Sequence, residues 1–180
     1  MIRAAIHHLD KHGVHERIGY VTLEDTVDGL LLTPDIHSLP PGERGFHIHE
    51  FGDLKPSAGK AGGSAGQHYD PQRTKRHLGP YGDGHLGDLP RLEVDSSGRA
   101  LTPVVAPRLT LDEVKGRALI IHSGGDNYSD TPVVNGGGKS RIAGGVITND
   151  CPYCKKDGLS LLETVALIGL GVVIYRGSKK

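Results

Sequence analysis

The stretch that decides the fold begins Gly45-Phe46-His47-Ile48-His49-Glu50 and runs to Asp88. His47 and His49 are two residues apart, so a strand directs both imidazoles to one face and Phe46 and Ile48 to the other. We expect the apolar pair to pack in a core and the two imidazoles to lie side by side at the surface. The remainder of the stretch is a long loop without periodicity, a type that is usually either functional or disordered.

Length, composition and charge narrow the class of protein. A chain of 180 residues fits one domain of ordinary size. Its formal net charge is zero, which gives no electrostatic reason to bind nucleic acid. The 27 glycines suit turns and loops and disfavour a helical bundle. Met1 leads directly into a predicted strand, so we expect no signal peptide and a cytoplasmic location.

Short β-prone runs separated by turn signals predict an all-β sandwich or flattened barrel of eight strands. Two of the runs, on either side of Asp95-Ser96-Ser97-Gly98, are expected to form a hairpin. Thr110 and Glu113 could cap one turn of helix. A second long loop is expected over Ser123 to Ser140. The predicted strands are Ile2 to Ile6, Ile18 to Leu23, Leu30 to Ile36, Gly45 to Glu50, Leu89 to Val94, Ala100 to Val105, Ala118 to His122 and Ile142 to Thr148.

Seven potential metal ligands gather in the two long loops and the strands beside them. A structural zinc ion takes four nitrogen, oxygen or sulfur ligands in a tetrahedron. The first loop supplies three imidazoles and a carboxylate, on His68, His77, His85 and Asp88. Three further imidazoles suit copper, which binds nitrogen more tightly than other divalent ions do; they belong to His47, His49 and His122. The alternative is that histidines on a glycine-rich loop are solvated and idle, but the grouping favours metal.

The chain also contains several separate motifs in a fixed order. They are Gly45-Phe46-His47-Ile48-His49-Glu50, Gly66-Gln67-His68-Tyr69-Asp70-Pro71, His85-Leu86-Gly87-Asp88-Leu89-Pro90, His122, and Gly136-Gly137-Gly138-Lys139-Ser140-Arg141-Ile142-Ala143-Gly144-Gly145-Val146-Ile147. Together they resemble the copper, zinc superoxide dismutase family, over roughly the first 148 residues. The run from Gly124 to Asp130 resembles the bacterial branch in particular. The resemblance implies an immunoglobulin-like, eight-stranded Greek-key β-barrel, with two long loops holding the metals outside it.

The resemblance implies a role for each matching residue. Copper would lie on His47, His49, His68 and His122, and zinc on His68, His77, His85 and Asp88. Asp126 would link a copper ligand to a zinc ligand, and Arg141 would attract superoxide to the copper. The implied activity is dismutation of superoxide to dioxygen and hydrogen peroxide, with His68 and Arg141 as catalytic residues. The alternative function is a non-catalytic copper/zinc-binding protein, either a metal store or a structural module.

The sequence departs from the family at its disulfide. Family members normally join the metal loop to an Ala-Cys-Gly-Val segment, which here reads Ala143-Gly144-Gly145-Val146, and no cysteine lies between Glu50 and His68. Losing such a bridge typically costs about 2–5 kcal/mol in a small domain. Metal binding or another contact must therefore hold the loop. The geometry of the homodimer that the family suggests becomes less certain as well.

Two segments fall outside the resemblance. We divide the chain into a barrel, residues 1–149, and an extension, residues 150–180, with Cys151-Pro152-Tyr153-Cys154 and the apolar run Leu159 to Tyr175. The cysteines could form a reversible disulfide, capture metal weakly or be inert. The apolar run could tether the barrel to a membrane or pack on a protein surface. Near the start of the chain, four histidines could collect metal or simply be exposed strand and turn residues; they are His7, His8, His12 and His15.

Overall fold

The computed structural model describes residues 1–149, which form an almost entirely β structure. The strands of this part are β1 (Ile2–Asp10), β2 (Gly13–Thr26), β3 (Gly29–Ile36), β4 (Gly42–Arg44), β5 (Phe46–His49), β6 (Leu92–Val94), β7 (Val104–Ala106), β8 (Ala118–His122) and β9 (Arg141–Val146). One short helix, α1 (Leu111–Val114), and two 3-10 turns, η1 (Gly63–Ala65) and η2 (Asn135–Gly137), complete it. The all-β prediction is confirmed.

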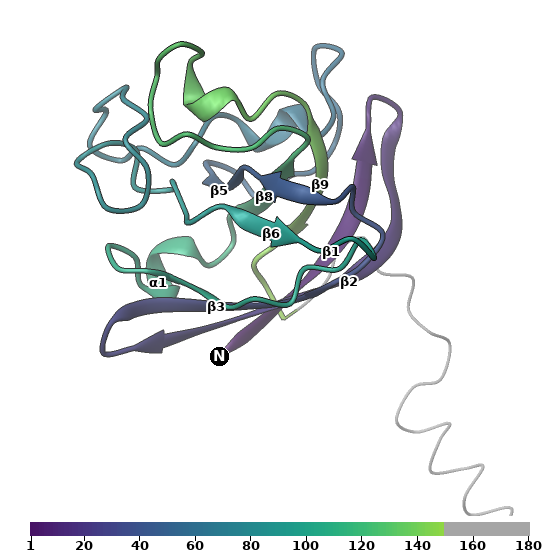
Figure 1. The fold of residues 1–180 in the computed structure, drawn as a ribbon, viewed down its shortest axis with the longest axis horizontal. Coiled ribbons are helices and arrows are strands. Elements are labelled where there is room, and N and C mark those ends of the chain that lie inside the picture. Colours follow the sequence, from purple (N-terminus) through teal and green to yellow (C-terminus); the bar gives the residue numbers. More distant parts are fainter. Residues whose placement is uncertain (150–180) are drawn as a thin grey trace, which may run out of the picture.

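Seven strands form one curled antiparallel sheet in the order β5-β8-β9-β1-β2-β3-β7 (Figure 1). The last strand, β9, lies between β1 and β8, so the C-terminal strand of the barrel pairs with the N-terminal one. A second sheet pairs β4 with β6. Both sheets contribute to one core, because Leu92 and Val94 of β6 cluster with buried residues of the curled sheet. This arrangement is the half-barrel expected of the fold class.

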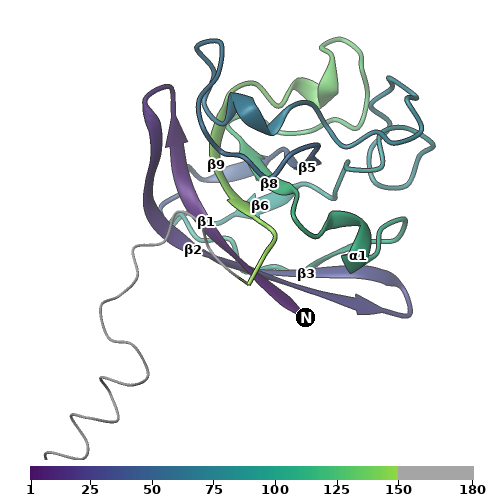
Figure 2. The same ribbon diagram turned by 180° about the vertical axis from the view of Figure 1, so that it is seen from behind.

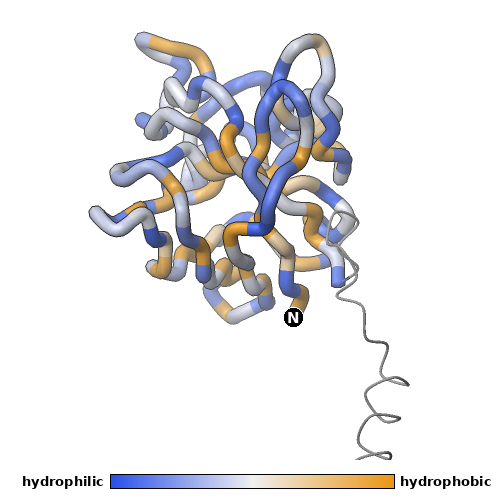
Figure 3. Tube along the Cα trace, turned by 90° about the vertical axis from the view of Figure 1, so that its right-hand side faces the viewer, coloured by the Kyte–Doolittle hydropathy of each residue, from blue (hydrophilic) through white to orange (hydrophobic). Residues whose placement is uncertain are grey.

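Apolar side chains alternate along the strands and meet in the core. Phe46 and Ile48 of β5 are fully buried there with Leu119 and Ile121 of β8. Figure 3 shows apolar and polar segments following one another along the trace. On β5, apolar side chains alternate with imidazoles, which fixes the register of the strand, because a shift of one residue would place His47 and His49 in the apolar core.

The sequence predicted eight of the nine strands, at approximate positions, and made two errors. The segments around Leu92 and Val104 do not form a hairpin: β6 pairs with β4, whereas β7 pairs with β3. The residues between them instead lie along the end of β3, where Ala100 bridges Ile36. The short strand β4 begins at Gly42, directly after Pro40-Pro41, and was not predicted because its three residues form too short a pattern.

The two long loops, residues 50–91 and 123–140, lie at the same end of the barrel (Figures 1 and 2). They are joined directly, because the backbone N–H of His77 donates to Asp130 Oδ2 at 2.8 Å and that of Arg91 donates to the hydroxyl of Tyr128 at 3.0 Å. The second loop is also fixed to the start of β5, where the N–H of Gly45 donates to the carbonyl of Gly124 at 2.8 Å. No helix within residues 1–149 is long and apolar enough to cross a membrane. The apolar run Leu159 to Tyr175 lies outside the described residues.

Candidate metal centre

The first long loop folds back along β5 and pairs with it. The N–H of Ile48 donates to Gly87, and the carbonyl of Ile48 accepts from Tyr69, both at 2.8 Å. Isolated bridges place His68 opposite His49 and Asp88 opposite His47. Two distant segments of one loop thus bring their ligand residues beside the two histidines of β5.

The two imidazoles of β5 are buried, contrary to the surface position expected from the sequence. His47 is 0% and His49 1% exposed. The strand does direct them away from the apolar core, but the loops then cover that face. Surface histidines would be solvated, whereas these two are covered by the loops and are withdrawn from bulk water.

Ligand atoms of His47, His49, His68 and His122 all lie within 4.8 Å of one another, and so do those of His47, His68, His77 and Asp88. His85 adjoins the second group, since its Nδ1 is 3.4 Å from Asp88 Oδ1. His68 lies between the groups. Its ring centroid is 4.0 Å from that of His47 and 5.3 Å from that of His85. The structure therefore brings together all seven ligand residues predicted from the sequence.

Six buried ligand atoms in this cluster have no hydrogen-bond partner. They are His47 Nδ1, His49 Nε2, His122 Nε2, His77 Nδ1, His85 Nδ1 and Asp88 Oδ2. His77 Nδ1 and Asp88 Oδ2 lie 2.9 Å apart, yet without the angles of a hydrogen bond. A buried polar atom without a partner is unfavourable by about 1–3 kcal/mol. Six such atoms in two sets of three fit two metal ions, which would satisfy all of them.

Asp126 links the two groups of ligand residues through its carboxylate. Its carboxylate accepts from His47 Nε2 at 2.8 Å and from His77 Nε2 at 2.7 Å. Each ring is thereby oriented with its Nδ1 toward a metal group. Gly136, at φ +67°, permits this approach, because a Cβ there would lie 2.0 Å from Asp126 Oδ1.

The protonation states of His49, His68, His122 and Asp88 suit metal binding. Burial lowers the pKa of His49 and His122 well below the usual range, and burial with the neighbouring His47 lowers the pKa of His68 to about 3. These imidazoles are therefore neutral, as metal ligands must be. Burial alone would raise the pKa of Asp88, but the hydrogen bond from His68 and the close approach of the His77 and His85 rings hold it far below its usual range. The carboxylate is ionised and available as a ligand.

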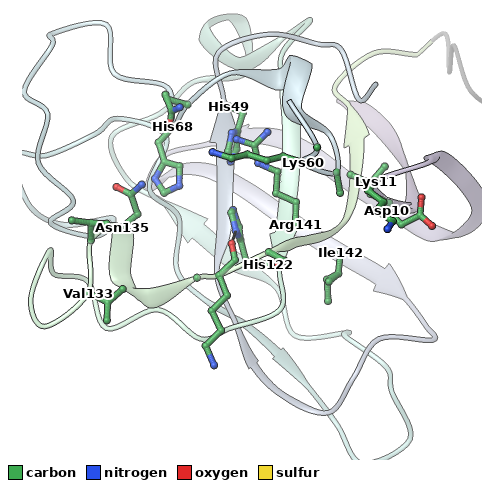
Figure 4. A pocket seen from close by; sticks show the side chains of 18 residues that line it. Asp10, Lys11, His49, Lys60, His68, His122, Val133, Asn135, Arg141 and Ile142 are labelled. Carbon is green, nitrogen blue, oxygen red and sulfur yellow. Dashed lines mark hydrogen bonds between the residues drawn. The ribbon is translucent and has the colours of Figure 1, made fainter. Parts of the chain in front are cut away.

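A pocket of about 750 Å³ leads from the surface to the first group (Figure 4). Arg141 points into it between His49 and His122, and Lys60 lies nearby. The Arg141 guanidinium donates to the carbonyls of Gly62 and Gly66, which fixes its position. The lining also includes Lys11 and Lys139, with Asp10 as its only acidic residue. The pocket therefore favours small anions.

Leu54 holds the first loop where the family has its disulfide. It is fully buried in a second apolar cluster that includes Leu9 and Ile120. A Cβ at Gly144 would approach the Cδ1 atoms of those same two residues, Ile120 at 2.8 Å and Leu9 at 3.2 Å. The glycine thus leaves room for the side chains against which Leu54 packs. The apolar packing of Leu54 thus takes the place of the family's disulfide.

Sequence reasoning found the seven ligand residues, Asp126 and Arg141, and missed two features of the site. Leu54 had a signal, since it is an apolar residue in a polar loop. Lys11 had none, because its place at the pocket depends on where the β1–β2 hairpin ends relative to loops far along the chain.

Comparisons with known proteins agree with this geometry. The family model for copper/zinc superoxide dismutase matches residues 17–147. A superoxide dismutase [Cu-Zn] of Escherichia coli is 54% identical over 140 residues, which cover 75% of this chain and 81% of that protein.

Solved structures extend the likeness to three dimensions. The Cu/Zn superoxide dismutase of Brucella abortus has a TM-score of 0.78 and 42% identity, covering 81% of this chain and 97% of its own. The monomeric copper, zinc superoxide dismutase of Salmonella enterica has a TM-score of 0.73 and 50% identity, covering 81% and 98%. With the family model matching most of the chain, the chain belongs to the copper/zinc superoxide dismutase family, in its bacterial branch.

Proposed function

We propose that this protein dismutates superoxide, converting two superoxide anions and two protons into dioxygen and hydrogen peroxide. The observation that supports it best is the division of six unpartnered ligand atoms into two sets of three, with His68 between them. One set contains only imidazole nitrogens and opens to a cationic pocket. The other contains a carboxylate and is remote from the pocket.

The donor sets fit copper and zinc. His47, His49 and His122 offer three neutral nitrogens, the preference of copper, and His68 completes the group. The zinc set consists of His68, His77, His85 and Asp88, which matches the three-nitrogen, one-oxygen sites that zinc accepts. When bound, copper supplies reversible one-electron chemistry, and zinc has none of its own.

The remaining steps belong to the chain's own residues. Arg141 is held by the first loop with its charge in the pocket, so it can attract and orient an anion beside the imidazole set. His68 Nδ1 is directed to Asp88 Oδ1 at 2.9 Å, which leaves Nε2 for the other set. Were Nδ1 to give up its proton to hold the zinc ion, the ring could carry its single proton at Nε2 and release it to the product.

A non-catalytic metal store is the second candidate, because the same ligands could simply retain copper and zinc. Arg141 argues against it. A store gains nothing from a guanidinium fixed at the mouth of the copper ligands, whereas an enzyme acting on an anion does.

Superoxide decay measured with metal-loaded protein tests the proposal. Protein loaded with copper and zinc should accelerate the decay catalytically, over many turnovers per chain. Protein loaded with zinc alone is the matched control and should leave the spontaneous rate unchanged. Equal rates in the two samples, with both metals shown to be bound in the first, would favour the store.

Location and assembly follow as further proposals. Leu54 anchors the metal loop without an oxidant, which supports a reducing compartment such as the cytoplasm. The run Leu159 to Tyr175 supports the alternative of a membrane tether. The homodimer that the family resemblance suggests is a third proposal. Sedimentation of the full chain, with and without vesicles, distinguishes these states.

A further inference from the structure

Arg91 connects the two-stranded sheet to the metal centre from outside the set of ligand residues. It is the last residue before β6, which pairs with β4. Its Nε lies 3.1 Å from Glu43 Oε1 on β4, and its Nη1 donates to the backbone carbonyl of Asp126 at 3.2 Å. One planar guanidinium therefore ties this sheet to the residue whose carboxylate links the two ligand groups.

Tyr128 completes the same connection. Its hydroxyl accepts the backbone N–H of Arg91 at 3.0 Å, and the Arg91 guanidinium carbon lies 5.4 Å from the centre of its ring. The backbone N–H of Tyr128 donates in turn to Asp126 Oδ1 at 2.8 Å. Asp126 is thus held at its carbonyl and at its carboxylate by two residues that also contact each other.

The backbone of Tyr128 adopts a conformation that a bulky side chain rarely takes. Its φ is +59°, in the left-handed region. The ring packs against Gly79, where an added Cβ would lie 2.7 Å from Tyr128 Cβ and Cγ. Unfavourable backbone conformations persist where the surrounding contacts enforce them, and they cluster at functional sites. The contacts that enforce this one are those that lead from Arg91 to Asp126.

We propose that Arg91 and Tyr128 are positioning residues, which act through Asp126 and determine how tightly both metals are held. The Asp126 carboxylate accepts from His47 at 2.8 Å and from His77 at 2.7 Å, so it must keep one orientation to serve both rings. A displaced carboxylate would release the two rings together and weaken both ligand groups. The inference rests on the copper and zinc assignment of the proposed function, but not on turnover.

Metal affinity measured by chelator competition tests this role. Arg91→Ala and Tyr128→Phe should each weaken copper and zinc binding by about three- to tenfold, less than the roughly 10–100-fold effect of a residue that contacts the ligands directly. Both should also shift the electron paramagnetic resonance signal of bound copper(II). Arg99→Ala, which changes an exposed arginine beyond β6, is the matched control and should alter neither. All samples are full chains with Cys151→Ser and Cys154→Ser, because these thiols can also bind metal.

A double variant separates positioning from general loosening of the barrel. The Arg91 side chain is 39% exposed, so its truncation should leave the protein folded. If Arg91 acts through Asp126, Arg91→Ala combined with Asp126→Asn should bind both metals no more weakly than Asp126→Asn alone. Additive losses, unchanged affinity in the single variants, or an equal loss in Arg99→Ala would overturn the proposal. An inactive wild type that still binds both metals would refute only the proposed function, because the readouts here are binding and spectra.

Discussion

Leu54→Ala should release the first long loop from the barrel, because Leu54 is the apolar anchor in the position of the family's disulfide. The substitution removes three fully buried carbons, worth about 0.8 kcal/mol each in transfer free energy. The cavity that remains beside Leu9 and Ile120 adds to this, so the total is about 3 kcal/mol. In a barrel of this size, that loss lowers Tm by about 6–12 °C.

The effect should concentrate in the loop, and limited proteolysis can show this. Lys60, followed by Ala61, is a trypsin site in the same part of the loop as Leu54, whereas Lys55 precedes Pro56 and resists trypsin. A loss of about 3 kcal/mol corresponds to roughly a hundredfold increase in the population of the open loop. Cleavage after Lys60 should accelerate accordingly, and copper should be lost more readily because Arg141 and His68 depend on the same loop.

Leu23→Ala provides the control, since Leu23 is equally buried but belongs to the main core. It should lower Tm by a similar amount without selective cleavage in the loop. If the two variants are cut at the same sites at the same rate, Leu54 is an ordinary core residue and our explanation for the missing disulfide is wrong.

Four further predictions follow from the same structure. Arg141→Ala should lower the second-order rate constant with superoxide and reduce its dependence on salt, with both metals retained; unchanged kinetics would exclude Arg141 from the reaction. Asp126→Asn should weaken copper and zinc binding about 10–100-fold in competition with chelators, since His47 and His77 lose their shared acceptor; unchanged affinity would contradict that role. The hydrogen bond to Asp10 raises the pKa of His15 from 6.5, and hydrogen bonds chiefly from His15 lower that of Asp10 from 3.8 to about 2. The His15–Asp10 pair therefore stabilises the folded protein fully between about pH 4 and 6.5, and this stabilisation is lost as the pH rises through the pKa of His15. In that higher range, Tm of the wild type should fall more steeply with pH than Tm of His15→Gln. Parallel curves would refute the coupling. Truncation after Asp150 should leave a soluble, metal-binding barrel, and loss of the metals would show that the extension is part of it.

The sequence predicted the ligands well because their spacing is local. His47 and His49 share a strand face, and the loop motif around His85 and Asp88 is continuous. Their burial was not predictable in this way. It depends on hydrogen bonds between β5 and segments 20 to 40 residues later, such as the bridge from His47 to Asp88.

The errors in the fold have a similar origin. A hairpin was expected around Asp95 because two β-prone runs flank a turn, but each run finds a different partner, β4 or β3. Local propensity cannot decide between a neighbouring strand and a distant one. A β-bulge in the β1–β2 pair, at His15-Glu16, was likewise invisible, since it arises from the register of two strands rather than from the residues of one.

Anomalous diffraction from the metal-loaded protein tests the central claim most directly. Data collected at the copper and zinc absorption edges locate each element separately. We predict one copper among His47, His49 and His122 and one zinc among His77, His85 and Asp88, with His68 between the two ions. Zinc in both positions after copper loading, or no metal in the set of three imidazoles, would contradict the dinuclear centre from which the proposed activity is derived.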